Sequence, residues 1–206
     1  MIVTGDNGVG KSTLLYLCAG LLNATGGHVW LDGHEAVATR PSDLVRQGVR
    51  RGFVFGHGGL LSNLSALANV TLGLRYHADL FGYDDKEITL RAREALTQLR
   101  VAQADFHALP AHLSAGVRKR VAFARAIAPN PNFVFLDDPD AGLDASTRRL
   151  VYEQLERFRD TEGLTQVITT NSRPLIERLG VHPMELAHGH VLPEDEVGRS
   201  RRALQF

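Results

Sequence analysis

One stretch decides the fold: Gly5-Asp6-Asn7-Gly8-Val9-Gly10-Lys11-Ser12. It matches G-x-x-x-x-G-K-[ST], and it lies between an apolar run at residues 1–4 and a helix-compatible stretch that begins at Ser12. Glycines let backbone N–H groups converge on an anion, and the N terminus of the next helix adds partial positive charge. The stretch therefore predicts a nucleotide site that includes Thr13, with Lys11 on the phosphates and Ser12 as a ligand of Mg²⁺.

Composition narrows the setting of this site. The chain has 206 residues, of which 44% are hydrophobic, enough for one domain with a core of its own. Because 23 basic residues balance 23 acidic ones, no overall basic field favours nucleic acid. The single cysteine, Cys18, favours a reducing, cytoplasmic setting. Neither a signal peptide nor a run of about 18 apolar residues is present, so a membrane role would need a partner that spans the membrane.

Strand-like and helix-like segments alternate along the chain, which is typical of an α/β fold with a mostly parallel sheet. Strands are predicted at 1–4, 29–31, 52–55, 133–136 and 166–169, and helices at 12–22, 64–74, 87–100, 147–158 and 174–179. A hairpin turn is predicted at Gly189, between His188 and His190, and the tail from Pro193 is expected to be a solvated end.

Two carboxylates follow a fully apolar strand at 133–136. Carboxyl ends of parallel strands face the ligand crevice of such a sheet. Asp137 is therefore predicted to hold Mg²⁺, and Asp138 to act as the general base that polarises the attacking water. Taken alone, the pair also fits a strand that ends in an ordinary acidic turn.

Two further segments supply the context. Leu113-Ser114-Ala115-Gly116-Val117 precedes a helical run at 118–128, with Ser114 placed 23 positions before Asp137. Ala141-Gly142-Leu143-Asp144 follows the carboxylates closely. In this order and spacing, the segments resemble the signature motif, Walker B strand and D-loop of ABC transporter ATP-binding subunits.

The resemblance implies a P-loop NTPase (RecA-like) fold with an inserted helical subdomain. It divides the chain into a core at 1–74 and 131–192, a helical subdomain at 75–130 and a tail at 193–206, all one ABC domain. ATP and Mg²⁺ are the implied cofactors. The implied partners are a second cassette, identical or paralogous, and a transmembrane permease, which would hold the protein peripherally on the cytosolic face of the membrane.

The resemblance also implies that the signature motif contacts the nucleotide of the second cassette. Leu113, Ser114, Ala115 and Gly116 would make this contact across the dimer, with Asp144 in the D-loop. Ser114 equally fits an N-cap of the helix at 118–128, and both roles are compatible.

Several positions depart from the family pattern. Gly56 stands where the Q-loop glutamine is usual, with His57 next to it as a possible replacement. Asp138 replaces the catalytic glutamate, and Asn171 replaces the switch histidine, whose imidazole can hold a proton as an amide cannot. In the signature, Ala115 replaces a glycine and Val117 a glutamine. Binding is therefore expected to survive while hydrolysis is slow.

Family members usually have a segment before the P-loop strand, including an aromatic residue that stacks on adenine. In this sequence Met1 stands four residues before Gly5. Either the gene model begins late or base stacking comes from elsewhere. Trp30, Phe53 and Tyr16 fit core or surface positions better than they fit replacements, so we expect poor selectivity for adenine over guanine.

The branch of the family is less constrained. Residues 117–122 and 58–75 are similar to ATPases that serve MCE-type (Mla) lipid transporters, and the run at 60–67 fits either a groove for a coupling helix or a plain buried turn. Lipoprotein-release, cell-division and haem-export cassettes share much of the pattern. A degenerate cassette paired with an active one, and a soluble non-transport P-loop protein, are the alternatives outside transport.

Overall fold

A six-stranded sheet forms the centre of the computed structural model, which describes residues 1–36 and 40–193. The strand order is β4-β5-β6-β1-β7-β8, and every neighbouring pair is parallel except β7 with β8. The strands are β1 (Ile2–Thr4), β4 (Arg51–Val54), β5 (Phe133–Asp137), β6 (Thr165–Thr169), β7 (Met184–Ala187) and β8 (His190–Pro193). The predicted mostly parallel α/β sheet is confirmed.

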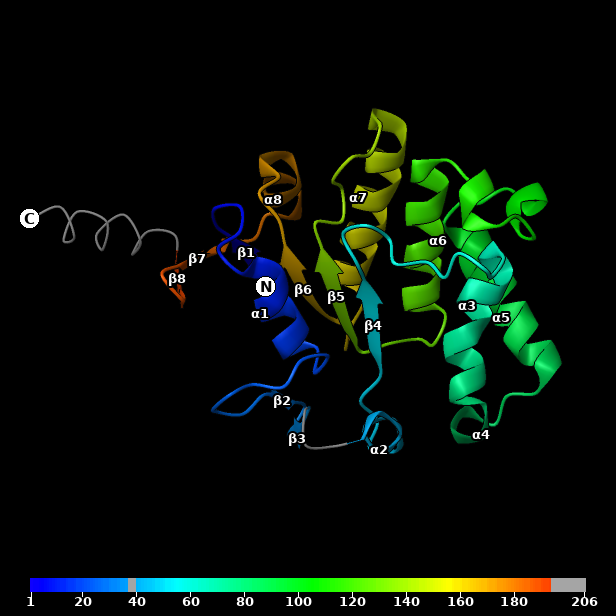
Figure 1. Ribbon diagram of the computed structural model, residues 1–206, viewed down its shortest axis with the longest axis horizontal. Coiled ribbons are helices and arrows are strands. Elements are labelled where there is room, and N and C mark those ends of the chain that lie inside the picture. The colour runs from blue at the N-terminus through cyan, green and yellow to red at the C-terminus, as the bar shows by residue number, and fades with distance from the viewer. Residues whose placement is uncertain (37–39, 194–206) are drawn as a thin grey trace, which may run out of the picture.

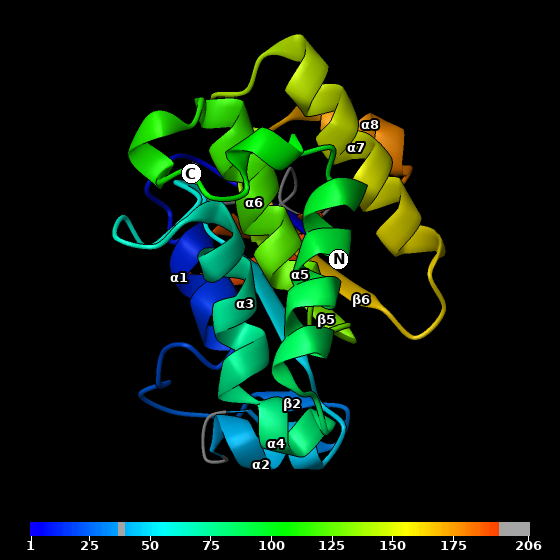
Figure 2. The same cartoon turned by 90° about the vertical axis from the view of Figure 1, so that its right-hand side faces the viewer.

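Helices cover both faces of this sheet. Helix α1 (Lys11–Cys18) lies on one face, whereas α6 (Ala115–Ile127), α7 (Ala145–Asp160) and α8 (Arg173–Leu179) lie on the other (Figures 1 and 2). Strand β5 separates two apolar clusters, since Val134 and Leu136 pack with the α6 and α7 side while Phe135 packs with Leu15 of α1. This alternation explains why the strand is apolar throughout.

Helices α3 to α6 form a second packing unit beside the sheet. Helix α3 (Ala66–Tyr76) packs against α5 (Asp85–Gln98) and α6, while α4 (Ala78–Phe81) follows α3 directly. Two short 3-10 turns, η1 (Gln103–Asp105) and η2 (Pro110–His112), lead into α6. Because residue 75 falls inside α3, we propose that the helical subdomain begins before Ala66 rather than at 75.

Some predicted bounds change for local reasons. The helix predicted at 12–22 ends at Cys18, because Gly20 has a φ of 67° and closes the helix in the left-handed conformation. The strand predicted at 29–31 is β2 (Trp30–Leu31), which pairs with β3 (His34–Glu35) in a separate two-stranded sheet ahead of α2 (Pro41–Arg46).

The C-terminal hairpin agrees with its prediction. Strands β7 and β8 are joined by His188 and Gly189. Their φ values of 49° and 79° fit the two-residue turn with positive φ that β-hairpins favour. The predicted tail lies outside the described residues from 194 onward. None of the described helices has the length and apolar character needed to cross a bilayer.

Close packing of α6 on β4 yields a testable stability difference between two glycines. A Cβ at Gly52 would lie 2.4 Å from the carbonyl oxygen of Ala126, so α6 would have to move. We expect Gly52→Ala to lower the free energy of unfolding by about 1–3 kcal/mol in urea denaturation. Gly73→Ala is the matched control, since nothing lies within 4 Å of its Cβ, and should raise stability by about 0.5–1 kcal/mol. Equal effects of the two substitutions would contradict this packing.

Candidate nucleotide site

The loop at residues 5–10 joins β1 to α1 in a conformation that requires glycine. Gly5, Gly8 and Gly10 have φ values of 145°, 81° and 107°. A Cβ at Gly5 would lie only 2.5 Å from the carbonyl oxygen of Leu186 in β7. The loop can therefore keep its backbone N–H groups free of side chains, as phosphate binding requires.

Helix α1 differs at its N terminus from the longer helices, whereas the shorter helices α2, α4 and α8 also lack a side-chain cap. Side chains of Ser65, Asp84, Ser114 and Asp144 cap α3, α5, α6 and α7, whereas Gly10 provides no side-chain cap to α1. The first-turn N–H groups, including those of Ser12 and Thr13, are therefore left for an external anion.

Lys11 is a buried cation without an anionic partner. Its side chain is 8% exposed, and Nζ donates to the carbonyl oxygens of Gly5 (2.7 Å) and Asp6 (3.1 Å). Among the described residues no carboxylate forms an ion pair with it. Carbonyl oxygens do not neutralise a buried charge, so the loop fits a group that brings negative charge of its own. The exposed Asn7 lies at the mouth of this loop beside Asn171.

Asp137 lies at the end of β5, held from two sides. Its Oδ1 accepts hydrogen bonds from Ser12 Oγ in α1 (2.9 Å) and from Thr169 Oγ1 at the end of β6 (2.8 Å). Asp137 and Thr169 are register partners in the parallel pair β5–β6. A carboxylate and a hydroxyl in contact at the mouth of a phosphate loop are oxygen donors of the kind Mg²⁺ prefers. The residues present therefore fit Mg²⁺ with a nucleotide.

Asp138 follows with a φ of 39°, a left-handed conformation that aspartate tolerates better than most residues. Burial raises the pKa of its carboxyl group, and the neighbouring Asp137 raises it further, while Lys11 acts in the opposite direction. Lys11 of the phosphate loop is thus close enough to influence this carboxyl group, and the role of Asp138 as a general base stays a prediction.

Lys119 of α6 is a second buried lysine at this site, and sequence reasoning did not single it out. It is 4% exposed, and Nζ donates to the carbonyl oxygens of Gly56 (2.9 Å) and Asp138 (3.2 Å). Burial lowers its pKa, and the carboxylates of Asp137, Asp138 and Asp140 oppose that effect. Lys119 therefore ties the loop after β4 to the loop after β5.

Gly56 lies directly beside Asp137. A Cβ built on it would be 3.5 Å from the Asp137 carbonyl oxygen and 3.7 Å from Oδ2, both ordinary contacts. A side chain at position 56 would thus start at the metal carboxylate, as expected for a Q-loop residue. His57 is exposed and its ring packs 5.8 Å from that of Phe55, so its replacement role stays a prediction.

Asn171, at the predicted switch position, contacts the phosphate loop. Its Oδ1 accepts a hydrogen bond from the Gly5 N–H (3.2 Å), and its Nδ2 lies 3.5 Å from Asn7 Oδ1. The structure therefore brings residues from the ends of β1, β5 and β6 together, although 166 positions separate Gly5 from Asn171.

The signature motif lies at the N terminus of α6, apart from α1, and the N termini of both helices point toward the top of the view (Figure 1). Leu113 is buried, Ala115 is exposed, and the exposed Ser114 accepts a hydrogen bond from the Val117 N–H (3.2 Å). The predicted cap is therefore confirmed. An added Cβ at Gly116 would lie 2.6 Å from Thr147 Oγ1, which explains the glycine there.

The D-loop residue Asp144 lies next to this motif. It caps α7 by accepting from the Thr147 N–H (2.9 Å), and its carboxylate also accepts from the hydroxyls of Ser146 and Thr147. These hydrogen bonds, that of Ser146 first, lower the pKa of Asp144. Signature motif and D-loop thus share one surface.

A buried cluster links the D-loop to the switch position. Asp140 Oδ2 accepts hydrogen bonds from Tyr152 OH and Ser172 Oγ, each at 2.7 Å, and the two hydroxyls lie 3.1 Å apart. Ser172 is adjacent to Asn171 in the chain. The cluster therefore holds the loop of Asp138 and the loop of Asn171 in a fixed relation.

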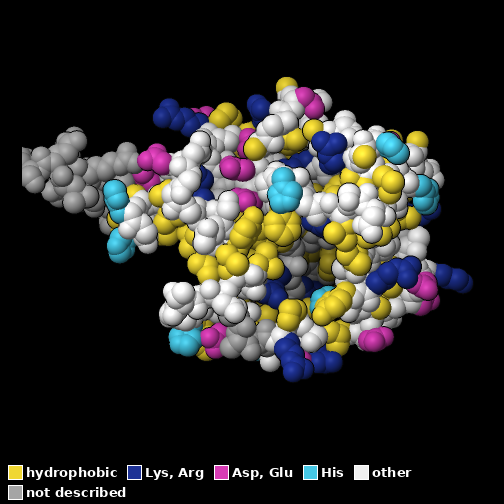
Figure 3. Space-filling view, viewed as in Figure 1, with side chains coloured by type: hydrophobic (Ala, Val, Ile, Leu, Met, Phe, Trp, Pro, Cys, Tyr) yellow, Lys and Arg dark blue, Asp and Glu magenta, His cyan; other side chains and the backbone are white. Residues whose placement is uncertain are grey.

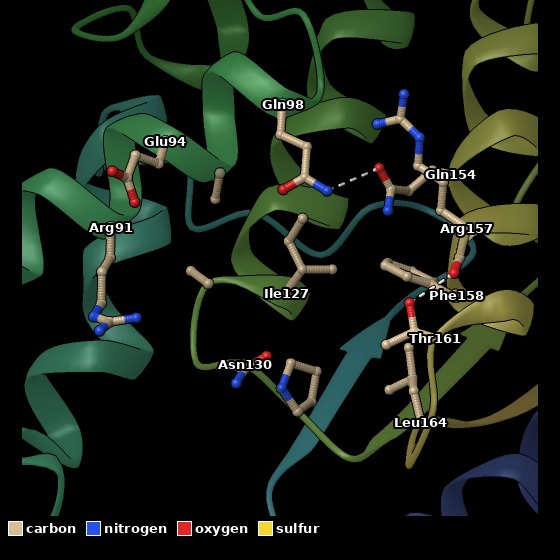
Figure 4. A pocket seen from close by; sticks show the side chains of 13 residues that line it. Arg91, Glu94, Gln98, Ile127, Asn130, Gln154, Arg157, Phe158, Thr161 and Leu164 are labelled. Carbon is tan, nitrogen blue, oxygen red and sulfur yellow. Dashed lines mark hydrogen bonds between the residues drawn. The ribbon is translucent and has the colours of Figure 1, made fainter.

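A separate cavity of about 430 Å³ lies among α5, α7 and the C-terminal end of α6 (Figure 4). Its lining includes Gln98 and Gln154, whose amides meet at 3.4 Å, together with Arg91 and Arg157. None of the predicted site residues lines it, so it is not part of the nucleotide site.

Comparison with known families agrees with this geometry. The ABC transporter family model matches residues 1–141. The chain belongs to the ABC transporter family. This membership agrees with the expected cofactors, ATP and Mg²⁺, and with the expected ATPase class.

Solved structures confirm the cassette fold. A dimeric ATP-binding cassette, MJ0796, in a post-hydrolysis state bound to ADP and Pi, superimposes with a TM-score of 0.80 at 30% identity, over 92% of this chain and 82% of that one. The predicted P-loop NTPase fold is confirmed.

Curated relatives have named import functions. The methionine import ATP-binding protein MetN 3 of Pectobacterium atrosepticum is 34% identical over 95% of this chain and 55% of its own length. A sulfate/thiosulfate import ATP-binding protein, CysA 1 of Chromobacterium violaceum, is 36% identical over 91% and 51%. The chain spans about half the length of these relatives. They support the ABC assignment but give no support to the lipid branch.

The Asp140 cluster yields a prediction about stability. Tyr152→Phe keeps the ring but removes one donor from a buried carboxylate, so we expect the free energy of unfolding to fall by about 1.5–3 kcal/mol. Ser172→Ala should be non-additive with it, because both hydroxyls serve the same oxygen. Tyr76→Phe, on a side chain 72% exposed, is the control and should change little. Additive effects in a double-mutant cycle would argue against a shared acceptor.

Proposed function

We propose that this chain is the ATP-binding subunit of an ABC transporter, which binds Mg-ATP and hydrolyses it slowly as one of a pair of cassettes. The observation that supports this most directly is the contact of Ser12 and Thr169 with the Asp137 carboxylate beside an uncapped helix and an unneutralised lysine. Each element is one that nucleoside triphosphate chemistry uses.

Each residue has a defined task in this proposal. Lys11 and the N–H groups of residues 8–13 bind the phosphates, and Ser12 with Asp137 holds the metal. Mg²⁺, when bound, offsets charge on the transferred phosphoryl group. Asp138 orients the attacking water, and Asn171 donates its amide near the phosphate loop.

Slow turnover follows from the substituted positions. Gly56 offers no side chain to the metal or to water, and Asn171 cannot hold a proton. Asp138 is one methylene shorter than glutamate, so its reach to the water is altered. Binding does not depend on these three groups, since the loop at 5–13 and Asp137 are intact.

The partner cassette is proposed from the location of the signature motif. Ser114 and Ala115 are exposed at the N terminus of α6, which adds partial positive charge. Since α6 lies apart from α1 in the same subunit (Figure 1), this terminus would serve the nucleotide of a second cassette. MJ0796 is described as a dimeric cassette, which supports the arrangement.

A groove on the face seen in Figure 3 is the proposed contact with a membrane permease. A hollow of about 290 Å³ lies between β4 and the α3–α4 region, with Phe53, Phe55 and Phe81 in its lining together with the half-exposed Leu21. An apolar groove of this kind fits a helix from a partner. Docking there would place the protein on the cytosolic face of the membrane.

The run at 60–67 does not line this groove, which favours the buried-turn alternative for that run. Leu60 and Leu67 pack against the core, and the fully buried Asn69 accepts from the Leu61 N–H and donates to the carbonyl oxygens of Leu61 and Leu64. Most of the run is therefore a turn held closed by one asparagine.

For the cargo, we favour import of a small polar nutrient, because relatives over most of this chain are methionine and sulfate importers. The lipid branch remains the alternative. Its sequence support is weak because the basic residues at 118–120 have structural partners: Arg118 donates to the Leu113 carbonyl oxygen, Lys119 to that of Gly56 and Arg120 to that of Arg100.

Binding and turnover can be separated with three variants. We expect the purified protein to bind a fluorescent ATP analogue in the presence of Mg²⁺, and Lys11→Ala to abolish binding while Lys86→Ala, on an exposed surface, does not. Asp138→Asn keeps a residue that tolerates the left-handed conformation but removes the base. It should bind normally and lose about 10²–10³-fold in phosphate release.

Two results would overturn this proposal, one of them entirely and the other in part. Absence of Mg-nucleotide binding by the wild type would remove the whole of it. Rapid turnover that is insensitive to Asp138→Asn would remove the assigned role of Asp138. Turnover that appears only with a second, different cassette would favour the alternative of a degenerate partner.

A further inference from the structure

We propose that the hydroxyl of Tyr16 holds the second oxygen, Oδ2, of the Asp137 carboxylate, beside the position where the Q-loop side chain is missing. Tyr16 is then a positioning residue for the metal site. This inference rests on the proposed function, since it assigns a role toward Mg²⁺ bound with a nucleotide.

Ser12 and Tyr16 are spaced on α1 so that both reach the Asp137 carboxylate. Tyr16 follows Ser12 by four positions, so both side chains lie on one face of the helix. Ser12 Oγ donates to Asp137 Oδ1 at 2.9 Å, and Tyr16 OH donates to Oδ2 at 3.5 Å. One face of α1 therefore donates hydrogen bonds to both oxygens of the Asp137 carboxylate.

The two oxygens differ in their other partners. Oδ1 already has two hydroxyl donors, Ser12 and Thr169. Within the described part of the chain, Tyr16 is the one hydrogen-bond donor to Oδ2, and its contact is long for a hydroxyl. Among the described residues, Tyr16 is therefore the side chain placed to hold Oδ2, whereas Oδ1 is held by two closer hydroxyls.

Gly56 approaches the same oxygen from another element. Its Cβ position lies 3.7 Å from Asp137 Oδ2 in open, ordinary contact, and its φ does not lie in the left-handed region. A glutamine there would start at the oxygen that Tyr16 reaches. Tyr16 of α1 and position 56 after β4 therefore both lie next to Asp137 Oδ2.

Neighbouring rings hold Tyr16 in this position. Its ring centroid lies 5.4 Å from that of Phe53 and 6.0 Å from that of Phe55, both in tilted or edge-on arrangements that aromatic pairs prefer. Both partners belong to β4 and the residue after it, next to Gly56.

A donor to the outer oxygen of a metal-binding carboxylate acts through orientation. Such partners commonly alter metal affinity by about 10–100-fold when they are removed. Tyr16 should therefore affect how much Mg²⁺ raises the affinity for nucleotide, and should leave the affinity without Mg²⁺ unchanged.

The test compares nucleotide affinity with saturating Mg²⁺ and with a chelator, using a non-hydrolysable ATP analogue. In Tyr16→Phe the ring packing stays and the hydroxyl is lost, so we expect the gain in affinity due to Mg²⁺ to fall about 10-fold or more. The Mn²⁺ spectrum of the same complex should show weaker metal binding. Tyr76→Phe, which removes an exposed hydroxyl elsewhere, should match the wild type.

Rescue distinguishes this role from a structural one. Gly56→Gln in the Tyr16→Phe background should restore the Mg²⁺ gain, whereas in the wild type it should add less, because Tyr16 already serves Oδ2. Thermal unfolding of the metal-free variants should stay close to that of the wild type.

Several outcomes would overturn the inference. An unchanged Mg²⁺ gain in Tyr16→Phe would do so, as would an equal loss of affinity with and without the metal. Should Tyr16→Phe fail to fold, Gly56→Gln alone decides, since a gain of about 10-fold over the wild type would show that Oδ2 was not served. A wild type that binds nucleotide with no help from Mg²⁺ overturns the proposed function as well, which separates the two failures.

Discussion

The site depends on one carboxylate held at the end of a buried strand. Asp137 is buried, and a carboxylate in such a position is costly unless hydrogen-bond donors reach it. Ser12 and Thr169 donate to it from a helix on one side and a strand on the other. These two bonds connect β5 to α1 and to β6, so the geometry of the phosphate loop relative to the metal carboxylate is set by the same contacts that make the charge tolerable.

Charged side chains gather around this carboxylate. Asp138 and Asp140 follow within three residues, and the two buried lysines, Lys11 and Lys119, lie among them. Lys119 donates to backbone carbonyl oxygens of two loops and so orders them, whereas within the described ranges Lys11 donates only to carbonyl oxygens of its own loop. Lys119 therefore has a structural role, and Lys11 is available to an incoming anion.

The basic residues after the signature motif illustrate why local similarity did not decide the branch. Arg118 and Lys119 donate to carbonyl oxygens at strand and helix ends, and Arg125 donates to those of Gly58 and Gly59. The contacts of Lys119 and Arg125 with the loop after β4 stabilise the joint between the helical subdomain and the sheet, whereas the contact of Arg118 lies within the subdomain. Any cassette with this joint can use them, so they carry no information about cargo.

The sequence by itself determined the phosphate loop, the carboxylates after β5, the mostly parallel sheet and the order of the motifs, because each depends on residue types at short spacing. Glycines at 5, 8 and 10 have φ values that few other residues adopt, and the apolar run at 133–136 has to be buried on both faces. Only the tertiary structure decided which side chains meet across the sheet. Thr169, Lys119 and Tyr16 reach Asp137 or its neighbouring loops from 19 to 121 positions away in sequence. Tyr152 and Ser172 reach Asp140 from 12 and 32 positions away, and no local pattern encodes such meetings. They arise because parallel strands bring their carboxyl ends to one edge, where distant residues share the same small volume.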